Sequence, residues 1–303
     1  MESRGTFSIV AFDRETGDVG VAVQSKYFAV GAVVPWAKAG VGAVATQAAG
    51  RAAYGPEILE LLLRGAEPDD AIEQALAGDE RRGTRQLGVV DATGRAAAFT
   101  GSECNEWAGH ATGAGYAAQG NILAGEAVVG DMARAFEESA GTLAERLMAA
   151  LEAAQAAGGD RRGQQSAALV VERPGGIPES REGIDRIVDL RVDDHEEPIR
   201  ELRRLLGLHD RMRLALETSG LYERREWGAA IAATQASLER FPEDPLLLYN
   251  LACYESLDGR RAAALEHLRQ ALAADPTMRE SARADSDFAA LAGELEFRAL
   301  VDA

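Results

Sequence analysis

Apolar runs separated by turn-forming residues predict β-strands at the start of the chain. The run Thr6–Phe12 is rich in β-forming residues and is followed by the turn-forming segment 13–18. A second apolar run at 19–23 comes next, so the two runs together predict a β-hairpin. The runs at 30–36 and 39–47 are small and continuously apolar, a pattern that indicates strands buried on both faces.

The rest of the first 206 residues adds further strands and several helices. Apolar spacing near 3.6 residues, with Pro and Gly at the ends, predicts helices at 56–64, 70–76, 127–139, 143–157 and 198–206. Continuous or alternating apolar runs predict strands at 85–91, 95–100, 116–121, 166–172 and 187–192. Strands, two helices, strands again and then helices are the order of an α+β fold with a layered αββα arrangement.

Beyond about Arg211 the strand signal ends and an internal repeat begins. Three residues recur after a shift of 34 positions, namely Ala230, Leu238 and Pro242 as Ala264, Leu272 and Pro276. Small residues at this spacing allow two antiparallel helices to cross closely, and the Pro ends the second helix. The segment resembles a tetratricopeptide repeat, with 288–301 as a capping helix. Two repeats and a cap lie below the usual three-repeat minimum, so this tail is expected to lean on the first domain or on a partner.

The length and charge of the chain narrow its class. Its 303 residues suffice for two domains, which the change of pattern divides into 1–208 and 209–303. The net charge of -17 argues against partners that are nucleic acids or anionic membranes, since both require clustered Lys and Arg. We expect no spanning helix and no secretory signal, and therefore a cytoplasmic protein.

The candidate chemistry centres on Thr6, at the start of the first strand. A Thr that becomes the first residue of a chain has a nucleophilic hydroxyl and an α-amine with a pKa near ~8, which can act as its base. The other reading is that Thr6 is an ordinary β-branched strand residue. Neither Cys104 nor Cys253 belongs to a zinc pattern, so no metal and no cofactor are predicted.

Polar residues at other strand ends could complete such a site. Ser25 and Lys26 end the second strand, and a Lys there, or Lys38 further on, could tune the nucleophile; the alternative is a solvated surface charge. Gln47 and Asn121 could position a substrate or donate to an oxyanion, or could instead satisfy buried backbone groups.

Two further segments carry charged residues with more than one reading. In the glycine-flanked loop 158–163, Asp160 and Arg161 could hold an anionic substrate group, or form a helix end with a surface ion pair. Asp193 and His195 could bind a metal with Asp194, but three adjacent residues of a strand point to alternating sides, so a helix-capping role for Asp194 or His195 ahead of Pro198 is favoured.

Taken together, several segments resemble a bacterial family, the domain of unknown function 1028, which is placed in the N-terminal-nucleophile (Ntn) hydrolase superfamily. The resemblance covers about 6–206 and is carried by 6–11, 31–36, 40–47, 85–91, 119–123, 157–167 and 189–195. It implies a four-layer αββα sandwich and hydrolysis of amide bonds. In that superfamily the nucleophile is the first residue of the first strand, which Thr6 matches here.

The resemblance also implies how the nucleophile would be freed. Removal of Met1 would expose Glu2, so freeing Thr6 requires cleavage of the Gly5-Thr6 bond. We therefore expect an amidohydrolase with a small amide or peptide-like substrate. Thr6 would be the nucleophile, Lys38 or Lys26 would tune it, and Ser25, Gln47 or Asn121 would assist.

The alternative is a non-catalytic scaffold whose repeat tail, residues 211–303, recruits a protein or peptide. The sequence leaves the possibility of a homodimer open.

Overall fold

The structure is a computed structural model that describes residues 5–176 and 184–302. It divides into two compact units, Met1–Gly207 and Leu208–Ala303. The first unit contains two antiparallel sheets with helices, and the second is helical. The prediction of an α+β chain with antiparallel strands and a helical C-terminal part is confirmed.

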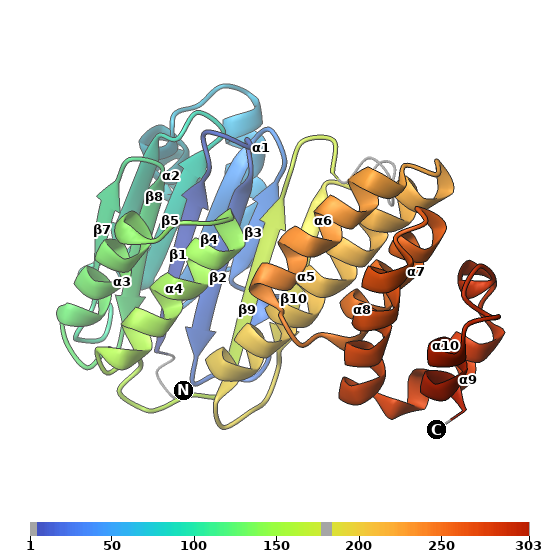
Figure 1. The fold of residues 1–303 in the computed structure, drawn as a ribbon. Helices are drawn as coiled ribbons and strands as arrows, with labels where there is room; N and C mark the ends of the chain where they lie inside the picture. The colour runs from blue at the N-terminus through green and yellow to red at the C-terminus, as the bar shows by residue number, and fades with distance from the viewer. Residues whose placement is uncertain (1–4, 177–183, 303) are drawn as a thin grey trace. The chain divides into compact units, whose positions relative to one another are not determined.

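The larger sheet has six strands, with β1 and β2 at its centre (Figure 1). Its spatial order is β10-β9-β2-β1-β8-β7. The strands are β1 Thr6–Phe12, β2 Val19–Ser25, β7 Gly109–Gly113, β8 Tyr116–Asn121, β9 Ser166–Glu172 and β10 Arg186–Val192. Side chains alternate along β1, so Phe7 and Ile9 face one side while Ser8 and Val10 face the other. Strand β7 was not predicted, because Gly, His and Thr interrupt its apolar pattern.

The smaller sheet has four strands in the order β3-β4-β5-β6. These strands are β3 Pro35–Lys38, β4 Gly42–Ala48, β5 Arg85–Asp91 and β6 Ala96–Thr100. Small apolar side chains such as Val10, Val21 and Ala45 form one buried cluster between the two sheets. Contacts between the sheets are close, since a Cβ added at Gly88 would lie 2.0 Å from the Gln119 Oε1 atom.

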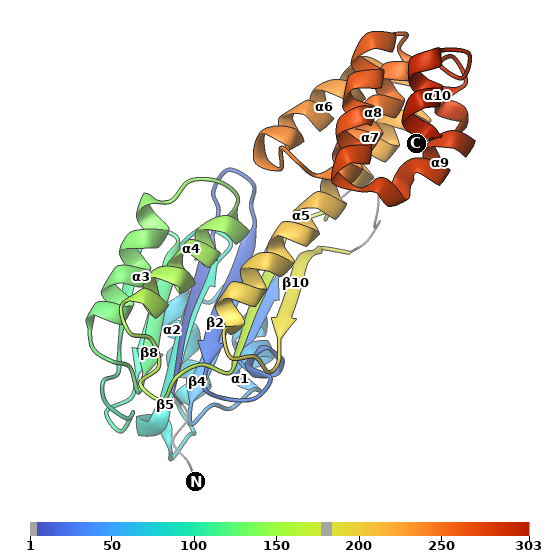
Figure 2. The same cartoon turned by 60° about the horizontal axis from the view of Figure 1, so that its bottom comes forward.

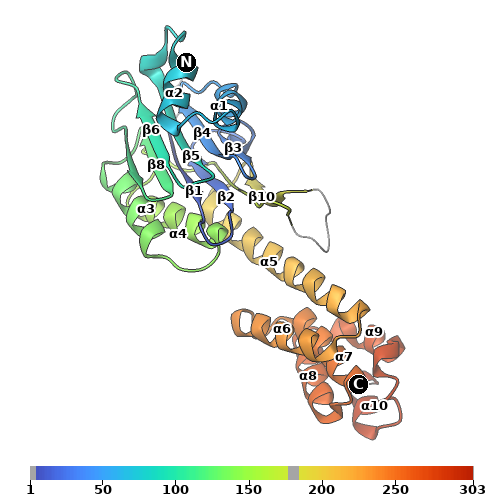
Figure 3. The same ribbon diagram turned by 90° about the horizontal axis from the view of Figure 1, so that it is seen from above.

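Helices cover the outer face of each sheet, as Figure 3 shows from above. Helices α1 Tyr54–Leu63 and α2 Pro68–Leu76 pack on the four-stranded sheet through Ile58, Ile72 and Leu87. On the six-stranded sheet lie α3 Ala127–Glu138 and α4 Leu143–Ala156, whose core contacts include Phe136 and Leu147. A capping box at Thr142 begins α4. The apolar stripes that predicted these four helices are therefore the faces that they bury.

The apolar run at 30–36 is not one strand, contrary to the sequence prediction. Val30–Ala32 form a 3-10 turn, which follows Ala29 in the left-handed region at φ 52°. The Val30 N–H donates to Ser166 Oγ at 3.0 Å, and a Cβ on Gly31 would lie 2.7 Å from the Ala168 Cβ atom. Val30 and Gly31 are buried because they pack on β9, so apolar character alone did not identify a strand.

Helix α5 Pro198–Glu223 is longer than the predicted 198–206. A glycine inside a helix costs only about 1 kcal/mol, and good helix formers follow Gly207. The helix therefore continues past the boundary between the two units.

The second unit contains a series of short helices, several of which Figure 2 shows side by side. They are α6 Trp227–Arg240, α7 Pro245–Leu257, α8 Arg261–Ala274, α9 Arg279–Ala284 and α10 Leu295–Val301. Ala230 and Ala264, which correspond in the repeat, are both fully buried in its core. None of the helices in the described part of the chain has the length and apolar character that a membrane span requires.

Candidate functional site

Strand β1 places Thr6 at one end of the larger sheet, between two polar neighbours. In the register of the sheet, Thr6 lies opposite Ser25 on β2 and opposite Asn121 on β8. Its side chain points to the same side as Ser8 and Val10, toward the second sheet. Thr6 is only 3% exposed, so the hydroxyl lies in a largely water-excluded position.

Three donors converge on the carbonyl oxygen of Gly5, the residue before Thr6. The Thr6 hydroxyl lies 2.6 Å from this oxygen, and the Ser25 hydroxyl donates to it. An Arg162 guanidinium N–H donates to the same oxygen at 2.8 Å. The Thr6 and Ser25 oxygens are themselves 2.9 Å apart, so a proton can pass between them. The Gly5-Thr6 peptide bond is thus polarised by a cation and by two hydroxyls.

The Asp160 side chain lies against the Gly5 Cα atom and holds this arrangement in place. The carboxylate is fully buried and accepts hydrogen bonds from the Lys26 backbone N–H and from the Arg162 backbone and guanidinium groups. A Cβ at Gly5 would lie 2.7 Å from both Asp160 oxygens. Because a short, four-fold bonded side chain cannot move away cheaply, only glycine fits before Thr6.

The loop after α4 delivers Arg162, rather than the predicted Arg161, to this position. Gly158 and Gly159 adopt left-handed backbone conformations, and Asp160 then pairs with Leu123 in an isolated β-bridge. Within this turn the Arg161 side chain is exposed, although its backbone N–H bonds to the Ile122 carbonyl. A usable sequence signal was the Asp two residues before Arg162, because Asp side chains bond to the backbone N–H two positions on.

A network of buried amides lies behind Thr6. Gln119 donates to Ser8 Oγ at 2.7 Å, and Ser8 donates to Gln47 Oε1 at 2.6 Å. Gln47 Nε2 then bonds to Gln86 Oε1 at 2.9 Å and to the Thr6 carbonyl at 3.4 Å. Asn121 Nδ2 also donates to Gln86 Oε1. Both predicted amides therefore lie at this end of the sheets, and their hydrogen bonds go to protein groups around Thr6.

A small cavity opens beside Thr6 on the side of the second sheet. Its volume is about 90 Å³. It is lined by Thr6, Tyr27, Val30, Val33, Val34, Thr46, Gln47, Ala48, Gly50 and Ala52. Cavities for drug-sized ligands span roughly 300–1,000 Å³, so this one has room for a group of only a few atoms.

The two predicted lysines do not contact Thr6. The Lys26 ammonium bonds to the Gln164 carbonyl at 3.0 Å, and only its backbone N–H reaches Asp160. Lys38 is exposed and pairs with Gly42, at the far end of β4 from Gln47. Gln47 lies five positions after Gly42 along the strand, or about 17 Å away, so the structure does not bring Lys38 to the site.

Asp193 and His195 belong to no group of three or more potential metal ligands among the described residues. His195 Nδ1 accepts the Glu197 backbone N–H at 2.9 Å, just before α5 begins, as the capping interpretation predicts. Across the described residues, one group of at least three potential metal-binding side chains is close enough together to share an ion, and it lies in the second unit.

Comparison with known proteins extends over most of the first unit. The profile of the family of unknown function DUF1028 matches residues 6–202. The chain is similar to the crystal structure of protein SPO2555 from Silicibacter pomeroyi, also assigned to DUF1028, at 39% identity and a TM-score of 0.61. That match covers 67% of this chain and 84% of the other. No curated protein matches the chain.

Proposed function

The chain belongs to the family of unknown function DUF1028, and from the geometry at Thr6 we propose that it is an Ntn-type amidohydrolase. In this proposal the two packed sheets and their outer helices are the αββα sandwich of that superfamily. The chain cuts its own Gly5-Thr6 bond, and the freed Thr6 then hydrolyses a small amide.

The observation that carries the proposal is the convergence of donors on the Gly5 carbonyl oxygen. An ordinary buried carbonyl in a strand needs one or two backbone partners, whereas this oxygen has Arg162 and two hydroxyls. One of those hydroxyls belongs to Thr6, which is the residue that would attack the carbonyl carbon. Donors aimed at an oxygen where negative charge develops stabilise a tetrahedral intermediate.

The groups around Gly5 provide a donor and an acceptor for each proton that moves during the cleavage. Thr6 Oγ1 attacks the Gly5 carbonyl carbon, its proton passes to Ser25 Oγ, and the Ser25 proton passes to the Gly5 oxygen. When this intermediate collapses, the Gly5-Thr6 carbon–nitrogen bond breaks and the Thr6 nitrogen takes up the proton. Water then hydrolyses the resulting ester, which releases a Gly5 carboxylate and leaves Thr6 with a free α-amine.

After cleavage the same groups would serve an external substrate. The α-amine is the base for the Thr6 hydroxyl, while Arg162 and Ser25 are left to bind the substrate carbonyl oxygen. The 90 Å³ cavity beside Thr6 suits a small amide or the end residue of a peptide. Lys38 has no part in this proposal because it lies at the other end of the sheet.

Intact-mass spectrometry of the purified protein tests the proposal. We expect a chain that begins at Thr6, and we expect Thr6→Ala and Gly5→Ala to remain uncut, the first for lack of a nucleophile and the second because a Cβ meets Asp160. Gly78→Ala is the matched control, since nothing lies within 4 Å of a Cβ there, and it should be cut normally. An uncut wild-type chain without activity on small amides would refute the proposal.

We also propose a second function, recruitment of a protein or peptide through residues 211–303. The supporting observation is a cavity of about 480 Å³ within the helical unit, which is in the usual range for ligand sites.

A further inference from the structure

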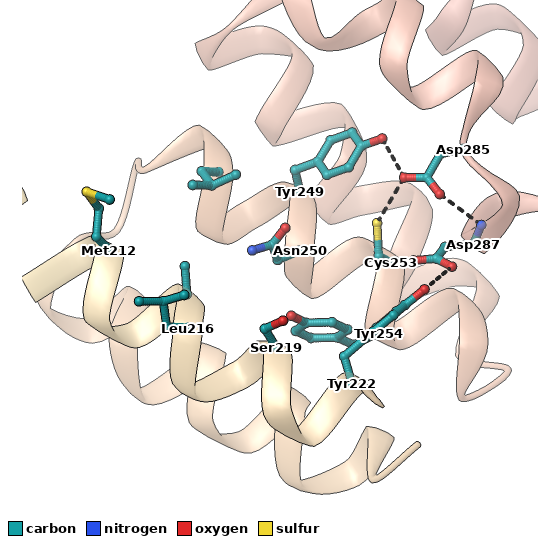
Figure 4. Close-up of a pocket in the computed structure, with 12 residues that line it drawn as sticks. Met212, Leu216, Ser219, Tyr222, Tyr249, Asn250, Cys253, Tyr254, Asp285 and Asp287 are labelled. Carbon is teal, nitrogen blue, oxygen red and sulfur yellow. Dashed lines mark hydrogen bonds between the residues drawn. The ribbon is translucent and has the colours of Figure 1, made fainter. Parts of the chain in front are cut away.

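The cavity of the helical unit combines aromatic, acidic and apolar walls. It is lined by residues of α5 and α7, by Asp285 and by the 3-10 turn Ser286–Phe288 that follows Asp285 (Figure 4). They are Met212, Ala215, Leu216, Ser219, Tyr222, Leu246, Tyr249, Asn250, Cys253, Tyr254, Asp285 and Asp287. No motif in the sequence marks this set, because its members come from segments far apart in the chain.

Two carboxylates in this cavity have only neutral partners. Tyr249 donates to Asp285 at 2.9 Å, and Tyr222 donates to Asp287 at 2.9 Å, as Figure 4 shows. Ligand atoms of Cys253, Asp285 and Asp287 lie within 4.8 Å of one another. Among the described residues, no Arg, Lys or His lies within ion-pair distance of either carboxylate. Two neighbouring half-buried negative charges without a cation strongly favour the binding of a positively charged ligand.

The other polar groups of the cavity remain neutral at physiological pH. Hydrogen bonding to Asp287 and burial raise the pKa of Tyr222 to about 12. Burial, followed by the nearby carboxylates, raises the pKa of the Cys253 thiol far above its ordinary value. The group near Cys253 therefore presents two carboxylates, a thiol and phenol hydroxyls to a ligand, and the carboxylates are its sources of negative charge.

Aromatic rings add a second attraction for a cation. Tyr222, Tyr249 and Tyr254 all line the cavity, and the Tyr222 and Tyr254 rings lie 6.0 Å apart. An ammonium group gains energy over the face of an aromatic ring in addition to its attraction to carboxylates. Rings and acids together form the surroundings that bind alkylammonium groups.

The remainder of the wall is exposed and apolar. Met212 is 67% exposed, Leu216 is 46% exposed and Leu246 is 45% exposed, although large apolar side chains are usually buried. A ligand with a cationic end and apolar neighbours would cover these side chains and place its charge beside the acids. A lysine side chain has this form, an alkyl stem that ends in an ammonium.

From these contacts we infer that the cavity binds the side-chain ammonium of a lysine, presented by a peptide with apolar residues on either side. The inference rests on the recruitment function proposed for residues 211–303 and is independent of the hydrolase proposal. Asp285 and Asp287 bind the charge, the tyrosines surround the stem, and Met212, Leu216 and Leu246 contact the flanking residues.

Calorimetric titration of the full-length Thr6→Ala chain tests the inference without interference from hydrolysis. The probe is the blocked peptide acetyl-Ala-Leu-Lys-Leu-Ala-amide, and its match has norleucine in place of lysine. Since one ion contact in a partly dry site is worth a factor of ten or more, we expect the lysine peptide to bind at least ~10-fold more tightly. Asp287→Asn should remove most of that difference, whereas Asp69→Asn, an exposed acid on α2, should not.

The other possible outcomes test the cation inference and the recruitment function separately. Equal binding of the two peptides would overturn the cation inference and leave recruitment standing, while no binding of either at about 1 mM would count against both. If n-butylammonium alone binds as tightly as the lysine peptide, the ligand is a small amine and the peptide inference is wrong. Tight binding of Zn²⁺ that Cys253→Ser abolishes, without binding of the lysine peptide, would replace the inference with a metal site.

Discussion

The candidate sites of the two units differ in how their carboxylates are paired. At the Thr6 end of the first unit, Asp160 is paired with Arg162 and three further bonds, and the amides behind Thr6 bond to one another. In the second unit, Asp285 and Asp287 bond only to neutral groups. At the first site the charged groups are paired within the chain, which suits a reaction that the chain performs on itself. The second site lacks a positive charge, which a cationic ligand can supply.

The largest effect on the first site is expected from removal of the Arg162 guanidinium. Loss of one donor to a developing oxyanion slows such reactions by about 10²–10³-fold, so Arg162→Ala should slow cleavage at Gly5-Thr6 by that factor. Arg161→Ala is the matched control, because its side chain is exposed and should leave the rate unchanged. The measurement is the time course of intact mass during refolding, and equal rates for both variants would remove Arg162 from the mechanism.

A smaller effect is expected where the buried network of the first unit loses one member. Ser8→Ala leaves the Gln119 amide N–H and the Gln47 amide oxygen without their partner, and each unsatisfied buried group costs about 1–3 kcal/mol. The free energy of unfolding in urea should fall by about 1–3 kcal/mol for each of these two groups, and Ser102→Ala, at an exposed position, should change little. A Ser8→Ala protein as stable as wild type would mean that the network is not matched as described.

The mildest test uses pH on the second unit. Burial, and then the charge of Asp285, raises the pKa of the Asp287 carboxyl, while its bond from Tyr222 opposes the shift. The titratable groups that face it are Asp285, Tyr222, Tyr249, Cys253 and Tyr254. A raised pKa means that the negative charge is lost at a higher pH than for an ordinary aspartate, so affinity for the lysine peptide should fall as the pH is lowered, and should begin to fall above the usual range of an Asp. An affinity independent of pH would contradict a role for Asp287.

Most of the first unit follows from the pattern of its sequence. The strands at 6–12, 85–91, 116–121 and 166–172 were predicted at their observed bounds, because continuous apolar runs between turn residues leave little choice. Ser25, Gln47 and Asn121 lie near Thr6 because each ends or nearly ends a strand at the same side of its sheet. That these strand ends lie together depends on the order and register of the strands, which the sequence does not show.

Other parts of the sites depend on geometry that the sequence does not carry. Whether Arg161 or Arg162 reaches Gly5 is decided by left-handed glycines in one turn. The position of Lys38 depends on the pairing of β3 with β4, and the sequence does not show which sheet end that pairing gives it. The cavity of the second unit joins residues of α5 and α7 to Asp285 and Asp287, and no short motif links them.

The bond from Arg162 to Gly5 also has a consequence for timing. These residues are 157 positions apart, and synthesis proceeds from the N-terminus. The strand that contains the proposed nucleophile leaves the ribosome long before the arginine that donates to the Gly5 carbonyl. A chain that stops early, or whose α4 fails to dock, keeps its threonine blocked. The proposed activation would thus report that the chain has been translated beyond Arg162 and that the loop after α4 has reached Gly5.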